Sequence, residues 1–204
     1  IGLIVDEWGT WYDVEPGTNP GFLYQQNTIR DALVAGINLN IFNKHCDRVK
    51  MANIAQMVNV LQSVILTDGD KMIKTPTYHV FNMYKHHQDA ELVDSFIETE
   101  EIGLEDENMV PNLTESVSVA KDGKIHITLT NLSLKKAYSI DTELADTKIK
   151  AVKGEIVGGD AHLHNTFAKP NTVKVNKFED VSFKDNKIKF KIPASSVLHL
   201  EVTV

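Results

Sequence analysis

The chain has 204 residues and a mass of 22.8 kDa, which is enough for one large domain or two smaller ones. With 42% hydrophobic and 24% charged residues, its composition is that of an ordinary globular protein. The formal net charge is −7 and the only arginines are Arg30 and Arg48, so nucleic acid is not an expected partner. Cys46 is the single cysteine, which excludes an internal disulfide and leaves the cellular compartment undecided. No apolar run approaches the roughly 18 residues of a membrane span, so a membrane is not an expected partner either.

The first element of the sequence is a continuous apolar run over residues 1–5, ended by the polar pair Asp6 and Glu7. Such a run is typical of a buried parallel strand rather than of a signal peptide, whose apolar core is longer. Because the chain begins inside this run, without an initiator Met, we expect it to be a fragment of a longer protein.

A helix and a second strand follow. Apolar residues recur at three- and four-residue steps over residues 27–45, and Thr28 with Asp31 resembles a capping box at the start of this helix. The short mixed segment 49–55 predicts a second buried strand. A strand, a helix and a strand in this order predict two parallel strands with the helix packed across them.

The rest of the chain changes character near Ala90. Thr75 and Pro76 are suited to the start of a helix that we expect over residues 75–87. Beyond it, apolar and polar residues alternate, which is typical of half-buried strands in a β-sandwich or jelly roll. The apolar positions are Ile125, Ile127 and Leu129; Ile188, Phe190 and Ile192; and Leu198, Leu200, Val202 and Val204. Fourteen of the nineteen lysines lie between Lys121 and Lys191, many at the polar positions, which predicts a solvated sheet face.

The candidate chemistry lies directly after the first strand. Asp6 and Glu7 would sit at its carboxyl end, where folds with parallel strands place their active sites. Both tryptophans of the protein, Trp8 and Trp11, follow within four residues. A carboxylate beside an indole that can stack on a sugar ring is typical of a glycosidase site. The alternative is that the carboxylates are solvated loop residues and the indoles belong to the core.

Gln56 is the second candidate, because it comes just after the predicted strand 49–55. Neighbouring parallel strands lie about 5 Å apart, so Gln56 could reach the same pocket as Glu7 and bond a sugar hydroxyl or the nucleophile. The alternative is an ordinary polar residue at a strand end.

These residues belong to three motifs that resemble a known family. The motifs are Asp6-Glu7-Trp8-x-x-Trp11-Tyr12, His45-Cys46-Asp47-Arg48-Val49 and Ala55-Gln56-x-Val58-Asn59-Val60. In order and spacing they resemble the C-terminal portion of the glycoside hydrolase family 51 α-L-arabinofuranosidases. Further similarity includes Val110-Pro111-x-Leu113, Asn131, Asn165-Thr166 with Pro170, and Ile192-Pro193-x-x-Ser196-Val197.

The resemblance implies an α/β part followed by an all-β part. Residues 1–89 would be the last βα units of a (β/α)8 barrel, and residues 90–204 an antiparallel, jelly-roll-like β-sandwich. Glu7 matches the catalytic nucleophile of a retaining enzyme, and Trp11 and Gln56 match residues that contact the arabinose. The acid/base glutamate of the family follows an asparagine, and this sequence has no Asn-Glu pair. A complete barrel takes about 250 residues, so the chain by itself is expected to be inactive.

The expected substrate is an arabinose-containing oligo- or polysaccharide, with no cofactor and no metal. Other expected partners are the missing N-terminal part of the barrel and, by resemblance, further copies in a homo-oligomer of the whole enzyme. The alternatives are a barrel glycosidase with another sugar specificity and a non-catalytic carbohydrate-binding or interaction module. The second is disfavoured because residues 90–204 hold no Trp and only Tyr138 among tyrosines. His86-His87 and His162-x-His164 were considered as metal ligands, but adjacent helix residues point in different directions and the second pair lacks an acidic or Cys partner.

Overall fold

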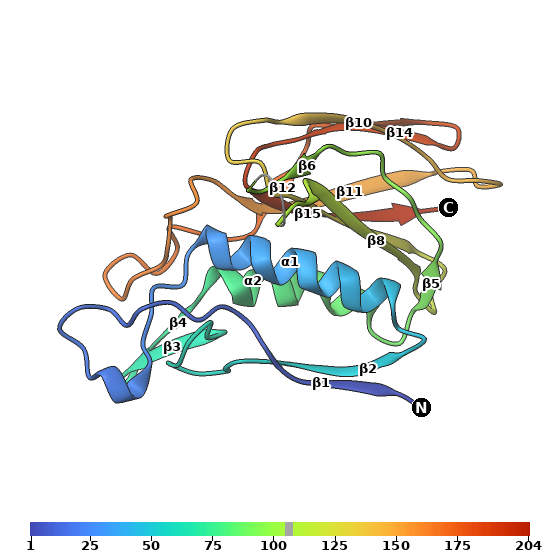
Figure 1. Ribbon diagram of the computed structural model, residues 1–204. Coiled ribbons are helices and arrows are strands. Elements are labelled where there is room, and N and C mark those ends of the chain that lie inside the picture. The colour runs from blue at the N-terminus through green and yellow to red at the C-terminus, as the bar shows by residue number, and fades with distance from the viewer. Residues whose placement is uncertain (105–107) are drawn as a thin grey trace.

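The computed structural model describes residues 1–104 and 108–204 and arranges them in three layers (Figure 1). Two helices, α1 (Ile29–Lys44) and α2 (Pro76–Tyr84), form the middle layer. On one side of them lie two parallel strands, β1 (Leu3–Trp8) and β2 (Val49–Ile54). On the other side lies an antiparallel β-sandwich. No helix among the described residues is long and apolar enough to cross a membrane.

The predicted order of strand, helix and strand is confirmed by β1, α1 and β2. The start of α1 follows from its cap, because the Asp31 carboxylate accepts a hydrogen bond of 2.7 Å from the backbone nitrogen of Thr28. Between β1 and α1 the chain runs through a long loop with a short 3-10 helix, η1 (Pro20–Phe22). The start of α1 is therefore fixed by a local sequence signal.

The expectation that β1 and β2 are buried strands is wrong for this chain. Leu3, Ile4 and Met51 are each about half exposed, at 45%, 54% and 54%. The reason is that the sheet has only two strands, so each strand has a free edge among the described residues, and α1 lies on one side of the sheet only (Figure 1). Exposed apolar residues that lie together on a strand pair mark a surface suited to contact with other protein.

The second helix begins as predicted, with the Thr75 hydroxyl accepting a hydrogen bond of 3.3 Å from the backbone nitrogen of Tyr78 and with Pro76 in the first turn. It ends at Tyr84 and continues as the tighter 3-10 turn η2 (Lys85–His87). A hairpin precedes it that the sequence did not predict, made of β3 (Ile65–Asp68) and β4 (Lys71–Lys74). Gly69 sits at its tip with φ +57°, a left-handed conformation that glycine adopts without strain.

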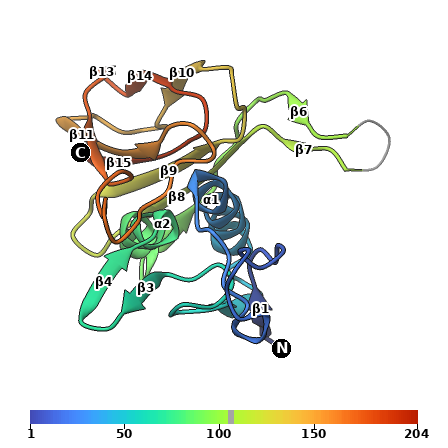
Figure 2. The same ribbon diagram turned by 90° about the vertical axis from the view of Figure 1, so that its left-hand side faces the viewer.

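The sandwich consists of a six-stranded and a three-stranded antiparallel sheet. The six strands are β5 (Glu91–Val93), β8 (Leu113–Val119), β9 (Ile125–Asn131), β11 (Ala151–Gly158), β12 (Asn176–Phe178) and β15 (Ser196–Thr203), in the order β12-β11-β15-β9-β8-β5. The three strands are β10 (Tyr138–Glu143), β13 (Val181–Lys184) and β14 (Lys187–Ile192), with β14 in the centre. A separate hairpin, β6 (Glu101–Ile102) with β7 (Val110–Pro111), extends away from the sheets (Figure 2).

The alternating apolar residues of the sequence meet between these two sheets. The largest contributors that are fully buried there are Leu113, Ile188, Ile192, Leu198 and Leu200. On β14 the alternation is confirmed in full, because Lys187, Lys189 and Lys191 are exposed between buried neighbours. Lys189 pairs with Asp141 of β10 at 2.7 Å on this outer face.

On the six-stranded sheet the prediction of a solvated polar face is wrong. Every residue of β9 is buried, including Thr128 and Thr130 at 0% exposure. The reason is that α1 and α2 cover the face opposite to the sandwich core, as Figure 2 shows. The helix approaches closely at Gly36, where a Cβ would lie 2.4 Å from the Thr130 hydroxyl. Helices and sandwich therefore share a second core.

Candidate active site

The carboxyl end of β1 carries the first candidate residue. Glu7 is exposed and precedes Trp8, the last residue of β1. The pairing register between β1 and β2 shifts between Val5 and Trp8, so the regular alternation of the strand is interrupted at Asp6 and Glu7. Bulges of this kind occur next to active sites, where they change the direction of a side chain.

The carboxyl end of β2 lies beside that of β1. Trp8 pairs with Ile54, and the backbone nitrogen of Ala55 donates a hydrogen bond of 2.8 Å to the carbonyl of Trp8. Gln56 follows directly and is exposed. Glu7 and Gln56 thus flank one interstrand contact, at the same end of a parallel pair.

The two tryptophans have different environments. Trp8 stacks against Phe81 with 6.0 Å between ring centroids and meets the edge of Phe42 at 5.4 Å, so its indole packs between the two helices. Trp11 lies in the loop after β1 and is 68% exposed. Of the two indoles that the sequence places near Glu7, Trp8 is part of the packing and Trp11 is free to contact a ligand.

The loop that carries Trp11 is held on both sides of this residue by buried polar side chains. The backbone nitrogen of Thr10 donates to Gln62 Oε1 at 3.0 Å, and the Thr10 hydroxyl donates to Asp31 Oδ1 at 2.7 Å. The backbone nitrogen of Tyr12 donates to Gln25 Oε1 at 2.9 Å. Gln25, Asp31 and Gln62 are each at most 2% exposed. None of them stands out as a site residue in the sequence, because their partners are distant along the chain.

A cation also lies beside this loop. The Arg30 guanidinium carbon stands 3.6 Å from the centroid of the Tyr12 ring, and Arg30 approaches the Asp31 carboxylate at 3.5 Å. Partial burial raises the pKa of the Tyr12 phenol, and the positive charge of Arg30 opposes that shift. Tyr12 is therefore neutral at physiological pH and turned towards the start of α1.

A cavity of about 1000 Å³ opens next to Gln56. Its lining includes the aromatic residues Phe22, Tyr24 and Phe167, together with the amide of Asn59. Phe167 comes from the loop between β11 and β12, so the second half of the chain also contributes to the neighbourhood of Gln56. A wall of aromatic rings and amides is chemically suited to a neutral polyhydroxylated ligand.

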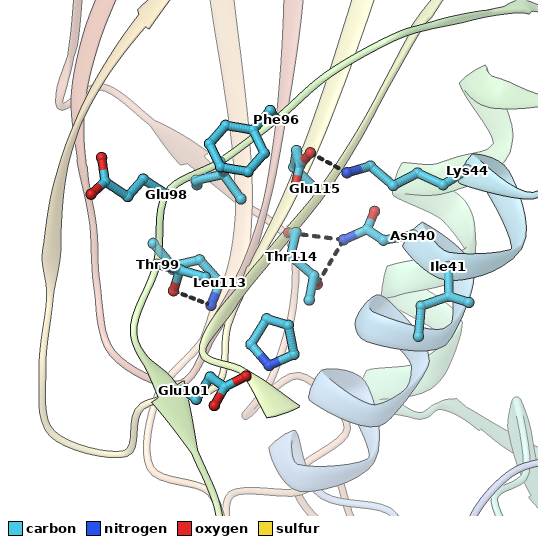
Figure 3. A pocket seen from close by; sticks show the side chains of 12 residues that line it. Asn40, Ile41, Lys44, Phe96, Glu98, Thr99, Glu101, Leu113, Thr114 and Glu115 are labelled. Carbon is cyan, nitrogen blue, oxygen red and sulfur yellow. Dashed lines mark hydrogen bonds and ion pairs between the residues drawn. The ribbon is translucent and has the colours of Figure 1, made fainter. Parts of the chain in front are cut away.

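A second cavity, of about 470 Å³, lies between α1 and β8 (Figure 3). It contains the ion pair of Lys44 with Glu115, and Asn40 Nδ2 donates to the carbonyl of Thr114 at 3.0 Å. None of Glu7, Trp11 and Gln56 lines it. The contacts of Lys44 with Glu115 and of Asn40 with Thr114 both join the helix to the sheet.

Of the two histidine pairs, His86 and His87 lie in η2, and His162 and His164 lie in the loop between β11 and β12. His86 stacks over His126 and His199, with ring centroids 4.8 and 5.0 Å away, and His126 Nδ1 is 3.0 Å from His199 Nε2. His87 bonds the hydroxyls of two sheet residues, and its burial lowers its pKa to about 4. In the part of the chain that the structure describes, no group of three or more His, Cys, Asp or Glu residues is arranged to hold a metal ion.

Comparisons with known proteins agree with the motifs. Residues 6–196 match the family described as the α-L-arabinofuranosidase C-terminal domain. The chain is 49% identical over 203 residues to an intracellular exo-α-L-arabinofuranosidase of Bacteroides ovatus, covering 99% of this chain and 40% of the relative. Among solved structures it is similar to a family 51 arabinofuranosidase from Xanthomonas axonopodis pv. citri, with TM-score 0.94 and 45% identity over 99% of this chain and 41% of that one.

A thermostable family 51 α-L-arabinofuranosidase from Thermotoga petrophila is also similar, with TM-score 0.86 and 25% identity over 99% of this chain and 43% of that one. The chain thus spans about 40% of the length of the relatives that it matches. Since the match to the family covers nearly all of its residues, the chain belongs to the α-L-arabinofuranosidase C-terminal domain family.

Proposed function

We propose that the chain is the C-terminal part of a retaining glycoside hydrolase. The whole enzyme would release terminal α-L-arabinofuranosyl residues from arabinan, arabinoxylan or derived oligosaccharides. Family membership and the activity for which the Bacteroides relative is named support this substrate class. The observation that carries the proposal is the position of Glu7 and Gln56 on either side of one contact between the carboxyl ends of β1 and β2.

In this proposal Glu7 is the nucleophile. Its carboxylate attacks the anomeric carbon of the arabinosyl group, and the bond to the leaving oxygen breaks as a second carboxyl group protonates that oxygen. Water, deprotonated by the second group, then releases arabinose from the ester on Glu7. Two carboxyl groups that act in this way stand about 5 to 5.5 Å apart. The exposure of Glu7 and the register shift at its position favour this role.

Trp11 and Gln56 would bind the sugar. The exposed indole of Trp11 offers a flat apolar face to the furanose ring, and the amide of Gln56 can bond a hydroxyl group. The neighbouring cavity with Phe22 and Phe167 has room for a larger part of the substrate.

The fold suggests how the chain fits into the whole enzyme. Residues 1–89 would supply the last βα units of a (β/α)8 barrel, with the sandwich over residues 90–204 as a second domain that packs against α1 and α2. The uncovered apolar faces of β1 and β2 would then meet the other strands of the barrel. The acid/base residue would come from that part, because the sequence has no Asn-Glu pair.

The first test is Glu7→Gln in the whole enzyme, measured with 4-nitrophenyl α-L-arabinofuranoside. Removing a covalent nucleophile is expected to lower kcat by at least about 10³-fold without changing the melting temperature. Asp6→Asn is the matched control, because Asp6 is the adjacent exposed carboxylate. Comparable loss in both variants would remove the nucleophile role from Glu7.

The second test uses a 2-fluoro-arabinofuranoside, which slows hydrolysis of the covalent intermediate. Mass spectrometry of a digest should find the sugar on the peptide that contains Glu7. The 204-residue chain by itself should show no turnover. Turnover that Glu7→Ala abolishes in this isolated chain would contradict the expected need for the missing part of the barrel.

A further inference from the structure

We propose that Gln62 is a positioning residue that fixes the Trp11 loop relative to Gln56. This inference rests on the proposed function, in which both residues contact the sugar. Gln62 itself is fully buried, at 0% exposure, and lies in the segment after β2 that also carries Gln56. Both polar atoms of its side chain and its backbone nitrogen have hydrogen-bond partners.

The side chain of Gln62 joins the Trp11 loop to both helices. Its Oε1 accepts a hydrogen bond of 3.0 Å from the backbone nitrogen of Thr10, the residue before Trp11. Its Nε2 donates to the carbonyl of Asp31 in α1 at 2.8 Å and to the hydroxyl of Thr77 in α2 at 3.2 Å. One amide therefore connects the loop to the rigid middle layer of the fold.

The backbone of Gln62 holds the other loop. Its nitrogen donates a hydrogen bond of 3.1 Å to the carbonyl of Ala55, so it fixes the peptide group between Ala55 and Gln56. The carbonyl of Gln56 accepts from the backbone nitrogen of Val64 at 3.2 Å. Both peptide groups that flank the Gln56 side chain are thus bonded to the segment around Gln62.

The two loops approach closely at this point. A Cβ on Gly9 would lie 3.2 Å from the carbonyl oxygen of Ala55 and 3.4 Å from Gln62 Oε1, and Gly9 has φ +142°. Glycine permits this backbone conformation and this close approach. The Gln62 amide consequently bonds the Trp11 loop next to the point where Gly9 passes the carbonyl of Ala55.

Only a neutral side chain with an acceptor and a donor satisfies these partners. A carboxylate at this position could accept from Thr10 but could not donate to Asp31, and a methionine has no donor and only a weakly accepting sulfur. Fixing sugar-binding groups before the substrate arrives lowers the entropic cost of reaching the reactive geometry. Loss of the Gln62 amide is therefore expected to reduce kcat/KM while leaving the ionisation of the catalytic carboxyl groups unchanged.

The kinetic test compares Gln62→Met with Thr77→Val in the whole enzyme. Both variants remove buried hydrogen bonds, but Thr77→Val leaves the contacts of Gln62 with Thr10 and Asp31 in place. We expect Gln62→Met to lower kcat/KM for 4-nitrophenyl α-L-arabinofuranoside by about 10- to 100-fold with an unchanged pH profile, and Thr77→Val by less than about threefold. Equal loss in the two variants would overturn the proposal.

Gln62→Glu tests the role of the Gln62 donor through the pH dependence of activity, which a purely structural role would leave unchanged. Its protonated carboxyl group has the same shape as the amide, accepting from Thr10 and donating to Asp31. The activity of this variant, relative to the original enzyme at the same pH, should therefore rise as the pH falls. A ratio that stays constant with pH would argue against the role of the Gln62 donor.

A spectroscopic test does not depend on activity. The chain has only two tryptophans, so Trp8→Phe leaves Trp11 as the single reporter in the 204-residue chain. In this background Gln62→Met should enlarge the nanosecond component of the Trp11 anisotropy decay, whereas Thr77→Val should not, with melting temperature confirming that each variant is folded. Unchanged decay would overturn the inference. If the whole enzyme cleaves no arabinofuranoside but the decay changes as expected, the proposed function fails while the positioning of the loop by Gln62 holds.

Discussion

The two faces of the six-stranded sheet are both buried, but they are stabilised differently. The face towards the three-stranded sheet carries Leu198 and Leu200 and is almost entirely apolar. The face towards the helices carries Ser116 and Thr128, whose hydroxyls bond the Asn40 amide of α1 at 3.0 and 2.9 Å. On the first face the stabilisation depends on buried apolar area, and on the second it depends on pairing of polar groups as well as on the apolar contacts of Val157 and Val197 with the helices.

The largest expected effect comes from the apolar face. Leu198→Ala removes a fully buried side chain whose neighbour across the sheet is Leu129, and it leaves a cavity that rigid strands cannot close. We expect the free energy of unfolding in urea to fall by roughly 2–5 kcal/mol. Leu134→Ala is the control, because Leu134 is 63% exposed and its loss is expected to change stability by about 0.5 kcal/mol or less. Similar values for the two variants would mean that the sandwich core tolerates the cavity by collapsing.

The next effect comes from the polar face. Asn40 Oδ1 accepts from the hydroxyls of Tyr84, Ser116 and Thr128, so Asn40→Leu removes the common acceptor of all three. We expect a loss of roughly 1–3 kcal/mol in the free energy of unfolding, the range for buried polar groups left without a partner. Asn38→Leu is the control on the same helix, because the Asn38 amide bonds only the carbonyl of Val34. A stability equal to that of the control would show that the three hydroxyls pair with one another instead.

The sequence could predict the apolar face of the sandwich strands, but it could not predict that the polar face is buried too. Local signals predicted the capped start of α1 at Thr28, the start of α2 at Pro76 and the alternation on β14. Alternation also grouped Thr128 with Thr130 on one face of β9. It did not reveal that helices from the first half of the chain cover this face, because that depends on contacts between distant segments.

The candidate site likewise contains residues that the sequence could predict and one that it could not. Glu7 and Gln56 could be found from the sequence because each comes at the end of a strand, and Trp11 because it follows Glu7 closely. Gln62 could not, since its side-chain partner Thr10 lies 52 residues away. A glutamine in an irregular segment carries no local pattern, and its importance follows only from complete burial and paired hydrogen bonds.

The smallest expected effect is a pH dependence of stability. It comes from a histidine on the helix-facing side of the six-stranded sheet. His199 of β15 is 4% exposed, beside His126 of β9 and under the ring of His86 from η2. Burial, followed by the nearby imidazoles and the Lys85 charge, lowers the pKa of His199 to about 3. The Glu155 carboxylate of β11, at 3.7 Å, favours the charged form but does not outweigh them. His199 is therefore neutral in the folded state at pH 6 to 7.

In the unfolded chain His199 takes up a proton near its ordinary pKa of about 6.5, so the unfolded state binds more protons than the folded state as the pH falls below that value. The stability that the neutral imidazole contributes is thus complete above pH 6.5 and decreases towards acid. From pH 7 to pH 6 this group should lower the free energy of unfolding by about 0.7 kcal/mol. Urea unfolding of the original chain and of His199→Gln at both pH values measures this difference, with His162→Gln as the exposed control. If His199→Gln keeps the full pH dependence, the imidazole is ionised as easily in the folded protein as in water, and the helix-facing side is more hydrated than its hydrogen bonds indicate.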